Sequence, residues 1–175
     1  MATTGRIMFW SLILSLTIAG SASAFDGRRT GFCLGFGAGV SRAGSGESND
    51  ALTGVQSTLD MGGGFSDQLL ILYSGHSTFY RHRNTNVVWL IPTVVARYYF
   101  KPAVQSFYVF GGPAVTAGVA WDNSEAGAGY GGFGVTAGGG YQGSRHFQAE
   151  LGGVRTSRYS SSFISAHATV SLVLF

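Results

Sequence analysis

The sequence predicts an all-β fold: an eight-stranded antiparallel up-and-down transmembrane β-barrel with a filled interior. Three observations lead to this prediction. Strand-like segments recur along the chain with turn residues between them, their large apolar side chains fall on one face, and the composition is unusual for a water-exposed domain. Charged residues make up only 11% of the 175 residues, against about 25% in ordinary globular domains, and 28 residues are glycine.

Eight segments have the composition of β-strands, because they are rich in β-branched and aromatic residues and are bounded by turn-forming residues. None of them keeps a helical period, and each glycine would disfavour a helix by about 0.8–1.0 kcal/mol relative to alanine. The predicted strands are residues 31–41, 54–65, 67–80, 87–100, 107–121, 130–142, 146–157 and 163–175.

The connections between these segments alternate in length and polarity. Longer polar stretches (RAGSGESNDALT, RHRNTN, DNSEAGAG and RYSSS) follow the first, third, fifth and seventh segments, whereas Ser66, KPAVQS and GSR follow the others. An even number of antiparallel strands, with long loops at one end and tight turns at the other, is typical of outer-membrane barrels. The pattern therefore predicts one barrel domain over residues 25–175.

The two faces of the predicted strands differ in side-chain size. In residues 31–41 and 54–65, large apolar side chains alternate with glycine or polar residues, and two later strands repeat the pattern. Glycine neither solvates nor shields the outside of a sheet, so the glycine faces fit the tight interior of a small barrel and the bulky faces fit lipid. In residues 107–121 the inner face is expected to carry small residues, namely Gly112, Ala114, Thr116 and Gly118. The third and fourth strands would fill the remaining space with Leu70, Leu72, Tyr80, Trp89, Ile91, Val95 and Tyr99.

Residues 1–24 have the features of a cleaved secretory signal peptide. Arg6 gives the positive start, residues 7–19 form the apolar core, and Ala22 and Ala24 provide the small residues before the cleavage point. The core is too short for a transmembrane helix, which needs about 20 residues. We expect cleavage after Ala24, export, and a final location in a bacterial outer membrane.

The number of segments, the alternating faces and the terminal Phe175 resemble the small eight-stranded outer-membrane barrels, similar to OmpX and the transmembrane domain of OmpA. The resemblance covers residues 25–175 at the level of architecture, without a motif of one subfamily. It implies recognition by the barrel-insertion machinery, with Phe175 as part of the insertion signal. In the family the face of the final Phe is apolar, whereas here that face carries Val173, Ser171, Thr169 and His167. Either Phe175 turns inward or a bulge shifts the register.

Three ionisable residues, Asp60, Arg97 and Glu150, are expected on the inner faces of the strands. Charges within a membrane-spanning segment are costly and often functional. Two interpretations are open: an ion-pair network inside a filled barrel, which the filled lumen favours, or a path for protons or ions. We predict that Arg97 pairs with Glu150, because the two should lie at similar depth.

His76 and His167 are also expected inside the barrel and suggest an enzymatic alternative. Some small outer-membrane barrels modify lipid A, and deacylases of this kind place His, Ser and Glu on their last strands. Glu150, Ser165 and His167 lie there in this chain, but without the His-x-Ser order of such a site. The sequence therefore predicts no catalytic residues and no enzyme, with a lipid A deacylase or acyltransferase as the alternative and a narrow solute channel as a further one.

The sequence indicates no cofactor, metal or nucleic-acid site. The four histidines are scattered, and the glycine-rich stretches do not complete a phosphate-binding motif. The formal net charge of +3 comes without a basic stripe that could follow a nucleic-acid backbone. Cys33 is the single cysteine, so no intrachain disulfide can form, and its role stays open.

Four arginines, Arg81, Arg83, Arg155 and Arg158, are predicted in or beside the longer loops. Because guanidinium groups match phosphate geometry well, they are candidate contacts to lipopolysaccharide, although ordinary solvated loop charge explains them equally well. The predicted function is a structural or surface-interaction role presented by extracellular loops. The expected partners of this monomeric barrel are outer-membrane lipid, lipopolysaccharide and the insertion machinery.

Overall fold

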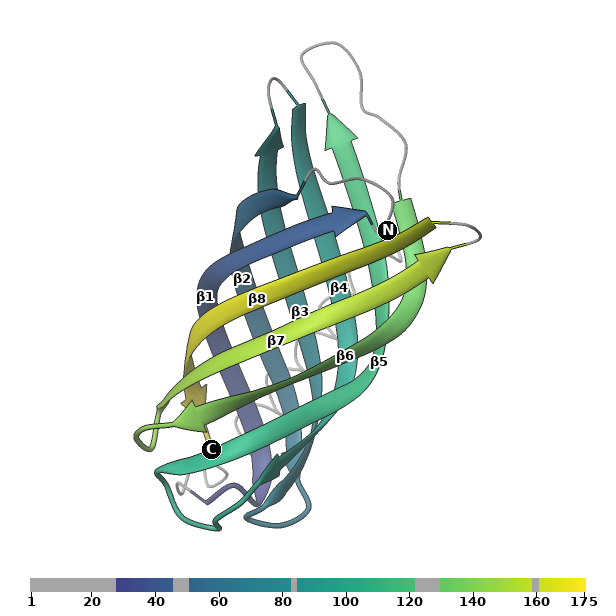
Figure 1. Ribbon diagram of the computed structural model, residues 1–175. Helices are drawn as coiled ribbons and strands as arrows, with labels where there is room; N and C mark the ends of the chain where they lie inside the picture. The colour runs from purple at the N-terminus through teal and green to yellow at the C-terminus, as the bar shows by residue number, and fades with distance from the viewer. Residues whose placement is uncertain (1–27, 46–50, 83–84, 122–129, 159–160) are drawn as a thin grey trace, which may run out of the picture.

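The computed structural model describes residues 28–45, 51–82, 85–121, 130–158 and 161–175. Eight β-strands account for most of these residues, as Figure 1 shows. Their bounds are β1 Gly31–Ser45, β2 Leu52–Gly64, β3 Leu69–His82, β4 Thr85–Tyr99, β5 Ser106–Trp121, β6 Tyr130–Gln142, β7 Phe147–Arg158 and β8 Ser161–Leu174.

Each strand pairs antiparallel with its neighbour in the sequence, and β1 also pairs with β8, so the sheet closes into the predicted barrel. Following paired residues once around the barrel from Arg42 leads back to Phe32 on the same strand, a shift of ten residues. A shear of this kind requires the strands to run obliquely to the barrel axis, as they do in Figure 1. Because of the tilt, residues on strands that are not neighbours can lie at the same level along the barrel axis and face each other inside the barrel.

Side chains alternate between an apolar outer face and an inner face closed to solvent. Phe36, Val55 and Phe133 are 52%, 66% and 78% exposed, whereas the inward-facing Gln56 and Thr136 are buried. This alternation follows from the strand itself, in which successive side chains point to opposite faces. The predicted fold class and the apolar outer face are therefore confirmed.

The interior is filled by large side chains that pack against glycine on the facing wall. A Cβ atom on Gly140 would collide with the Tyr108 ring, and one on Gly152 would lie 2.7 Å from both Phe110 and His167. Glycine at these two positions makes room for the rings, because the interior is packed without space for another carbon. The larger apolar cluster consists of Cys33, Leu70, Leu72, Val95, Tyr99, Tyr108, Phe110, Val173 and Phe175.

The predicted inner face of β5 is correct for Ala114 and Thr116, which are buried, but it omits two large side chains at the start of the strand. Tyr108 and Phe110 point inward there and are 1% and 7% exposed. The stretch FYVF is apolar at every position, so hydrophobicity alone does not assign a face to these residues.

The predicted alternation of long and short connections is correct for only part of the barrel. β3 ends at His82 and β4 begins at Thr85, while β7 ends at Arg158 and β8 begins at Ser161. These two connections are shorter than the turn between β4 and β5. The error arises because the strands continue past the apolar band, so polar residues that suggest a loop extend the strand instead.

The last strand keeps its alternation to the end of the chain. Its register with β1 runs without interruption from Ser45 opposite Phe163 to Leu34 opposite Leu174. Leu172 is exposed on the outer face, whereas Phe175 is 2% exposed and belongs to the interior apolar cluster. Of the two alternatives for this strand, Phe175 therefore turns inward and no bulge shifts the register.

Candidate functional site

The centre of the candidate site is Arg97, which β4 points into the barrel. Its Nη2 atom lies 3.0 Å from Asp60 Oδ2 and 3.0 Å from Glu150 Oε2, and its Nη1 donates to Gln148 Oε1 at 3.3 Å. Arg97 is 1% exposed, and both carboxylates are buried as well. The structure thus brings the three ionisable residues into one cluster that joins β2, β4 and β7 across the lumen.

Neutral hydroxyl groups complete the bonding of the two carboxylates. Ser74 Oγ donates to Asp60 Oδ1 at 2.5 Å, and the Tyr108 hydroxyl donates to Glu150 Oε2 at 3.1 Å. The Arg97 guanidinium carbon also lies 4.9 Å from the centre of the Tyr108 ring. Burying charged groups is expensive unless such additional hydrogen bonds offset the lost hydration. The arrangement is suited to holding strands together.

The two interior histidines adjoin this cluster. The rings of His76 and His167 lie 4.9 Å apart between centroids, and His167 Nε2 is 3.6 Å from Glu150 Oε1. His76 Nδ1 lies 3.0 Å from Gln56 Nε2, while His76 Nε2 lies 3.2 Å from Ser74 Oγ. The cluster therefore contains the residue types of a hydrolytic site, and the direction of its hydrogen bonds decides what it can do.

These hydrogen bonds do not activate Ser74 as a nucleophile. The Thr78 hydroxyl donates to Gln56 Oε1, which leaves Gln56 Nε2 to donate to His76 Nδ1. In the neutral ring the proton is then on Nε2, which donates to Ser74, and Ser74 in turn donates to Asp60. A catalytic histidine must accept the serine proton, whereas here the acceptor is a carboxylate already paired with Arg97. Ser165, the serine named in the enzymatic alternative, forms its hydrogen bond with another hydroxyl group, Ser41 Oγ, at 2.9 Å.

Arg29 closes the end of the barrel that carries the β2–β3, β4–β5 and β6–β7 turns, here called the short-turn end, and no pattern in the sequence singles it out. It is 3% exposed and lies with its guanidinium carbon 3.7 Å from the centre of the Tyr99 ring. Its Nε donates to Gln142 Oε1 at 3.0 Å, and its two terminal nitrogens donate to backbone carbonyls at 2.8–3.0 Å. Those carbonyls belong to Asp67, Lys101 and Ala103, in the turns β2–β3 and β4–β5.

Desolvation lowers the pKa of the Arg29 guanidinium, although the neighbouring Tyr99 and Asp67 act in the opposite direction. The side chain nevertheless satisfies four acceptors at once, which a planar guanidinium can do and an ammonium group cannot do in the same geometry. Arg29 therefore acts as a plug that fastens two turns to the interior.

The arginines proposed as loop contacts are distributed differently from the prediction. Arg81 lies within β3 and Arg155 within β7, and both point outward and are exposed. The assignment of Arg81 to a loop is wrong, because β3 extends past the predicted strand end at residue 80 into the polar stretch. Arg155 lies inside the predicted strand of residues 146–157, so it is a strand residue and not a loop contact. Arg83 and the side chain of Arg158 lie outside the described residues.

Among the described residues, no group of His, Cys, Asp and Glu side chains is arranged to hold a metal ion. Within the same ranges, no helix has the length and hydropathy needed to cross a membrane.

A closed eight-stranded barrel with an apolar outer face and a charged, filled interior is the fold of the small outer-membrane β-barrels, and this chain has that fold. Three solved structures illustrate the similarity. The Neisserial surface protein A superimposes with a TM-score of 0.55 and 15% identity, covering 81% of this chain and 96% of its own. Ail, the attachment invasion locus protein of Yersinia pestis, gives 0.54 and 11%, covering 83% and 99%. The outer membrane protein OprG from Pseudomonas aeruginosa gives 0.52 and 11%, covering 84% and 97%.

No protein-family model and no curated protein sequence matches the chain. The similarity is therefore one of fold, and the role of the protein has to be argued from its own residues.

Proposed function

We propose that this protein is a bacterial outer-membrane barrel with a structural and surface-interaction role. Its interior residues stabilise the barrel and form neither a catalytic nor a conducting site. The observation that carries the proposal is the bridge from Arg97 to Asp60 and Glu150, both at 3.0 Å, in a lumen filled by side chains. A filled eight-stranded barrel leaves no room for a solute path. The surface-interaction role is then carried by the ends of the strands and by the connections between them.

The outer-membrane location is supported by the apolar outer face and by the predicted signal peptide of residues 1–24. The structures with the same fold are described as an outer membrane protein, a surface protein and an attachment invasion locus protein. Those descriptions apply to those proteins, and they agree with a surface role for this one. Fractionation of cells that express the tagged protein, with heat-modifiable gel mobility as the sign of a folded barrel, tests the location.

Contact with lipopolysaccharide is part of this proposal and is supported by Arg81 and Arg155. Both side chains are exposed on the outer face near the end of the barrel opposite the Arg29 plug. Guanidinium groups there can bind phosphate in a bidentate manner. The double variant Arg81→Gln/Arg155→Gln should reduce binding to lipopolysaccharide-containing vesicles, whereas Lys101→Gln at the other end should not. Equal binding by both variants would remove these contacts from the proposal.

The enzymatic alternative can be tested separately, because Ser74, His76 and Asp60 do form a hydrogen-bonded group. We expect the mass spectrum of lipid A to be the same in cells with and without the protein. A lost or gained acyl chain that disappears in His76→Ala or His167→Ala would overturn the structural role. For the channel alternative, we expect no steady single-channel conductance from the folded protein in planar bilayers.

A further inference from the structure

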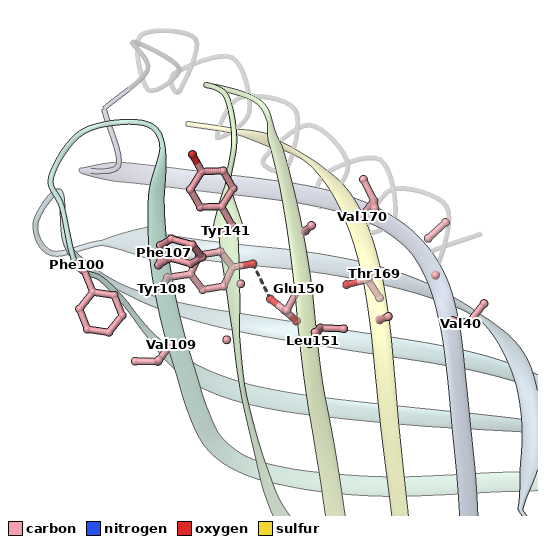
Figure 2. Close-up of a pocket in the computed structure, with 16 residues that line it drawn as sticks. Val40, Phe100, Phe107, Tyr108, Val109, Tyr141, Glu150, Leu151, Thr169 and Val170 are labelled. Carbon is pink, nitrogen blue, oxygen red and sulfur yellow. Dashed lines mark hydrogen bonds between the residues drawn. The ribbon is translucent and has the colours of Figure 1, made fainter.

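A groove of about 850 Å³ lies on the outer face of the barrel, across strands β5, β6, β7, β8 and β1. It is shown in Figure 2, where the Tyr108–Glu150 hydrogen bond lies behind it, inside the barrel. The groove lies in the apolar outer face and is distinct from the interior site. Its outward-facing lining is almost entirely hydrocarbon.

The floor of the groove is a continuous diagonal track of small outward-facing residues. Gly139 on β6 is diagonal to Ala149 on β7, which is diagonal to Ala168 on β8, and Ala168 is diagonal to Ala38 on β1. The paired positions beside this track carry large side chains, which form the walls. These walls include Val40, Val109, Tyr141, Leu151 and Val170. The track is therefore a recess between ridges.

The groove rises from the short-turn end of the barrel toward its middle. At one end lie Phe107, the second residue of β5, and Tyr141, whose rings are 4.8 Å apart between centroids. At the other end lies Val40, in the middle part of β1. Aromatic side chains of this kind mark the membrane–water interface in barrels. The groove thus leads from the interface at the turns toward the centre of the apolar band.

Two exposed cations lie beside the interfacial end. Lys101 directly follows the groove residue Phe100 in the β4–β5 turn, and Arg145 lies in the β6–β7 turn that follows Tyr141. The acidic residue of the described turns, Asp67, lies in the β2–β3 turn, away from the groove strands. The charge at this end therefore favours an anionic group at the interface.

We propose that the groove binds an acyl chain of an anionic glycerophospholipid, with the phosphate headgroup at Lys101 and Arg145. The inference rests on membrane insertion in the proposed function, because only then does the groove face lipid. A thin, flexible chain can fill a recess between ridges, whereas the convex outer face of a second barrel would bridge it. The bound lipid would be the one that fits both the apolar track and the basic end.

Native mass spectrometry of the protein, refolded in vesicles of phosphatidylethanolamine and phosphatidylglycerol and extracted in mild detergent, tests this proposal. Heat-modifiable mobility first confirms that each variant is folded, which separates failure of the barrel from failure of the groove. The test variant Ala149→Leu/Ala168→Leu fills the track. The matched control Ala117→Leu/Ala137→Leu adds the same bulk on the outer face outside the groove.

We expect phosphatidylglycerol to stay bound to the wild type and to the control and to be lost from the filled variant. Lys101→Gln/Arg145→Gln should remove the preference for phosphatidylglycerol over phosphatidylethanolamine, while Arg42→Gln at the opposite end should keep it. Equal retention by the filled variant and the wild type would overturn the proposal. A dimer mass that disappears in the filled variant would also overturn it, in favour of a second copy of the chain.

Discussion

The Arg97 guanidinium lies 3.0 Å from the Asp60 carboxylate, although β4 and β2 do not pair with each other. Together with the equal distance to Glu150 on β7, this contact joins strands on different sides of the barrel. The strands are thus held together by backbone hydrogen bonds between neighbours and by buried ion pairs across the lumen.

Replacing Arg97 by methionine should lower the free energy of unfolding by about 3–5 kcal/mol, because it leaves two buried carboxylates without their cation. Urea unfolding in lipid vesicles, followed by the change in gel mobility, measures the effect. The triple variant Asp60→Leu/Arg97→Met/Glu150→Leu serves as the control, since an apolar replacement of the whole cluster should recover most of the loss. A single variant as stable as the wild type would contradict the role of the cluster.

Double-mutant cycles should show coupling in both arms of the bridge. We expect coupling energies of about 0.5–3 kcal/mol for Arg97 with Glu150 and for Arg97 with Asp60, as for other residues in direct contact. Unfolding free energies of the single and double variants provide the measurement. Zero coupling between Arg97 and Glu150 would show that this ion pair does not stabilise the barrel.

Tyr108→Phe should cost about 1.5–3 kcal/mol of unfolding free energy, because the Glu150 carboxylate loses a hydrogen bond in the interior. The ring itself is kept, so packing against Gly140 and Arg97 is unchanged. Tyr73→Phe is the matched control, since Tyr73 lies on the outer face and is 42% exposed. The prediction fails if the two variants unfold at the same urea concentration.

Arg29→Ala should loosen the short-turn end while leaving the barrel folded. The turns of residues 65–68 and 100–105 lose the donor to their carbonyls, and their amides should exchange with deuterium faster than in the wild type. Lys101→Ala is the control, because Arg29 contacts the backbone carbonyl of that residue and not its side chain. Unchanged exchange in Arg29→Ala would mean that the plug does not stabilise the turns.

Gly152→Val should destabilise the barrel by about 1–3 kcal/mol, since even its Cβ would lie 2.7 Å from His167 Nε2 and from the Phe110 ring. Ala137→Val, on the outer face of β6, should change the unfolding free energy by less than about 0.5 kcal/mol. If both substitutions were equally tolerated, the glycine wall would not be needed for packing.

Much of the fold could be predicted because the alternation of side chains has a direct physical cause. In β1 the large apolar residues Phe32, Leu34, Phe36 and Val40 all fall on one face, and only one face of such a strand can point outward. The alternation does not locate strand ends, since a strand that leaves the apolar band keeps its hydrogen bonds while its residues become polar. Arg81 is an example, since the predicted strand ends at residue 80 whereas β3 continues to His82.

The candidate site was predictable in part. Inner-face assignments were enough to select Asp60, Arg97 and Glu150 and to place His76 and His167 inside the barrel. Which of them touch depends on the shear of the barrel, which a single sequence does not show. Arg29 could not be selected, because it precedes β1 in a polar stretch and its partners are four residues from three separate segments of the chain.

The contacts of Arg29 also constrain the order of assembly. Its acceptors come from residues 67, 101, 103 and 142, so they meet only after β2 to β6 have formed and curved toward β1. Contacts between residues this far apart in sequence form late, because the chain entropy of closing each loop must be lost first. The plug therefore closes only after the strands from β2 to β6 have carried these acceptors to the residues that precede β1.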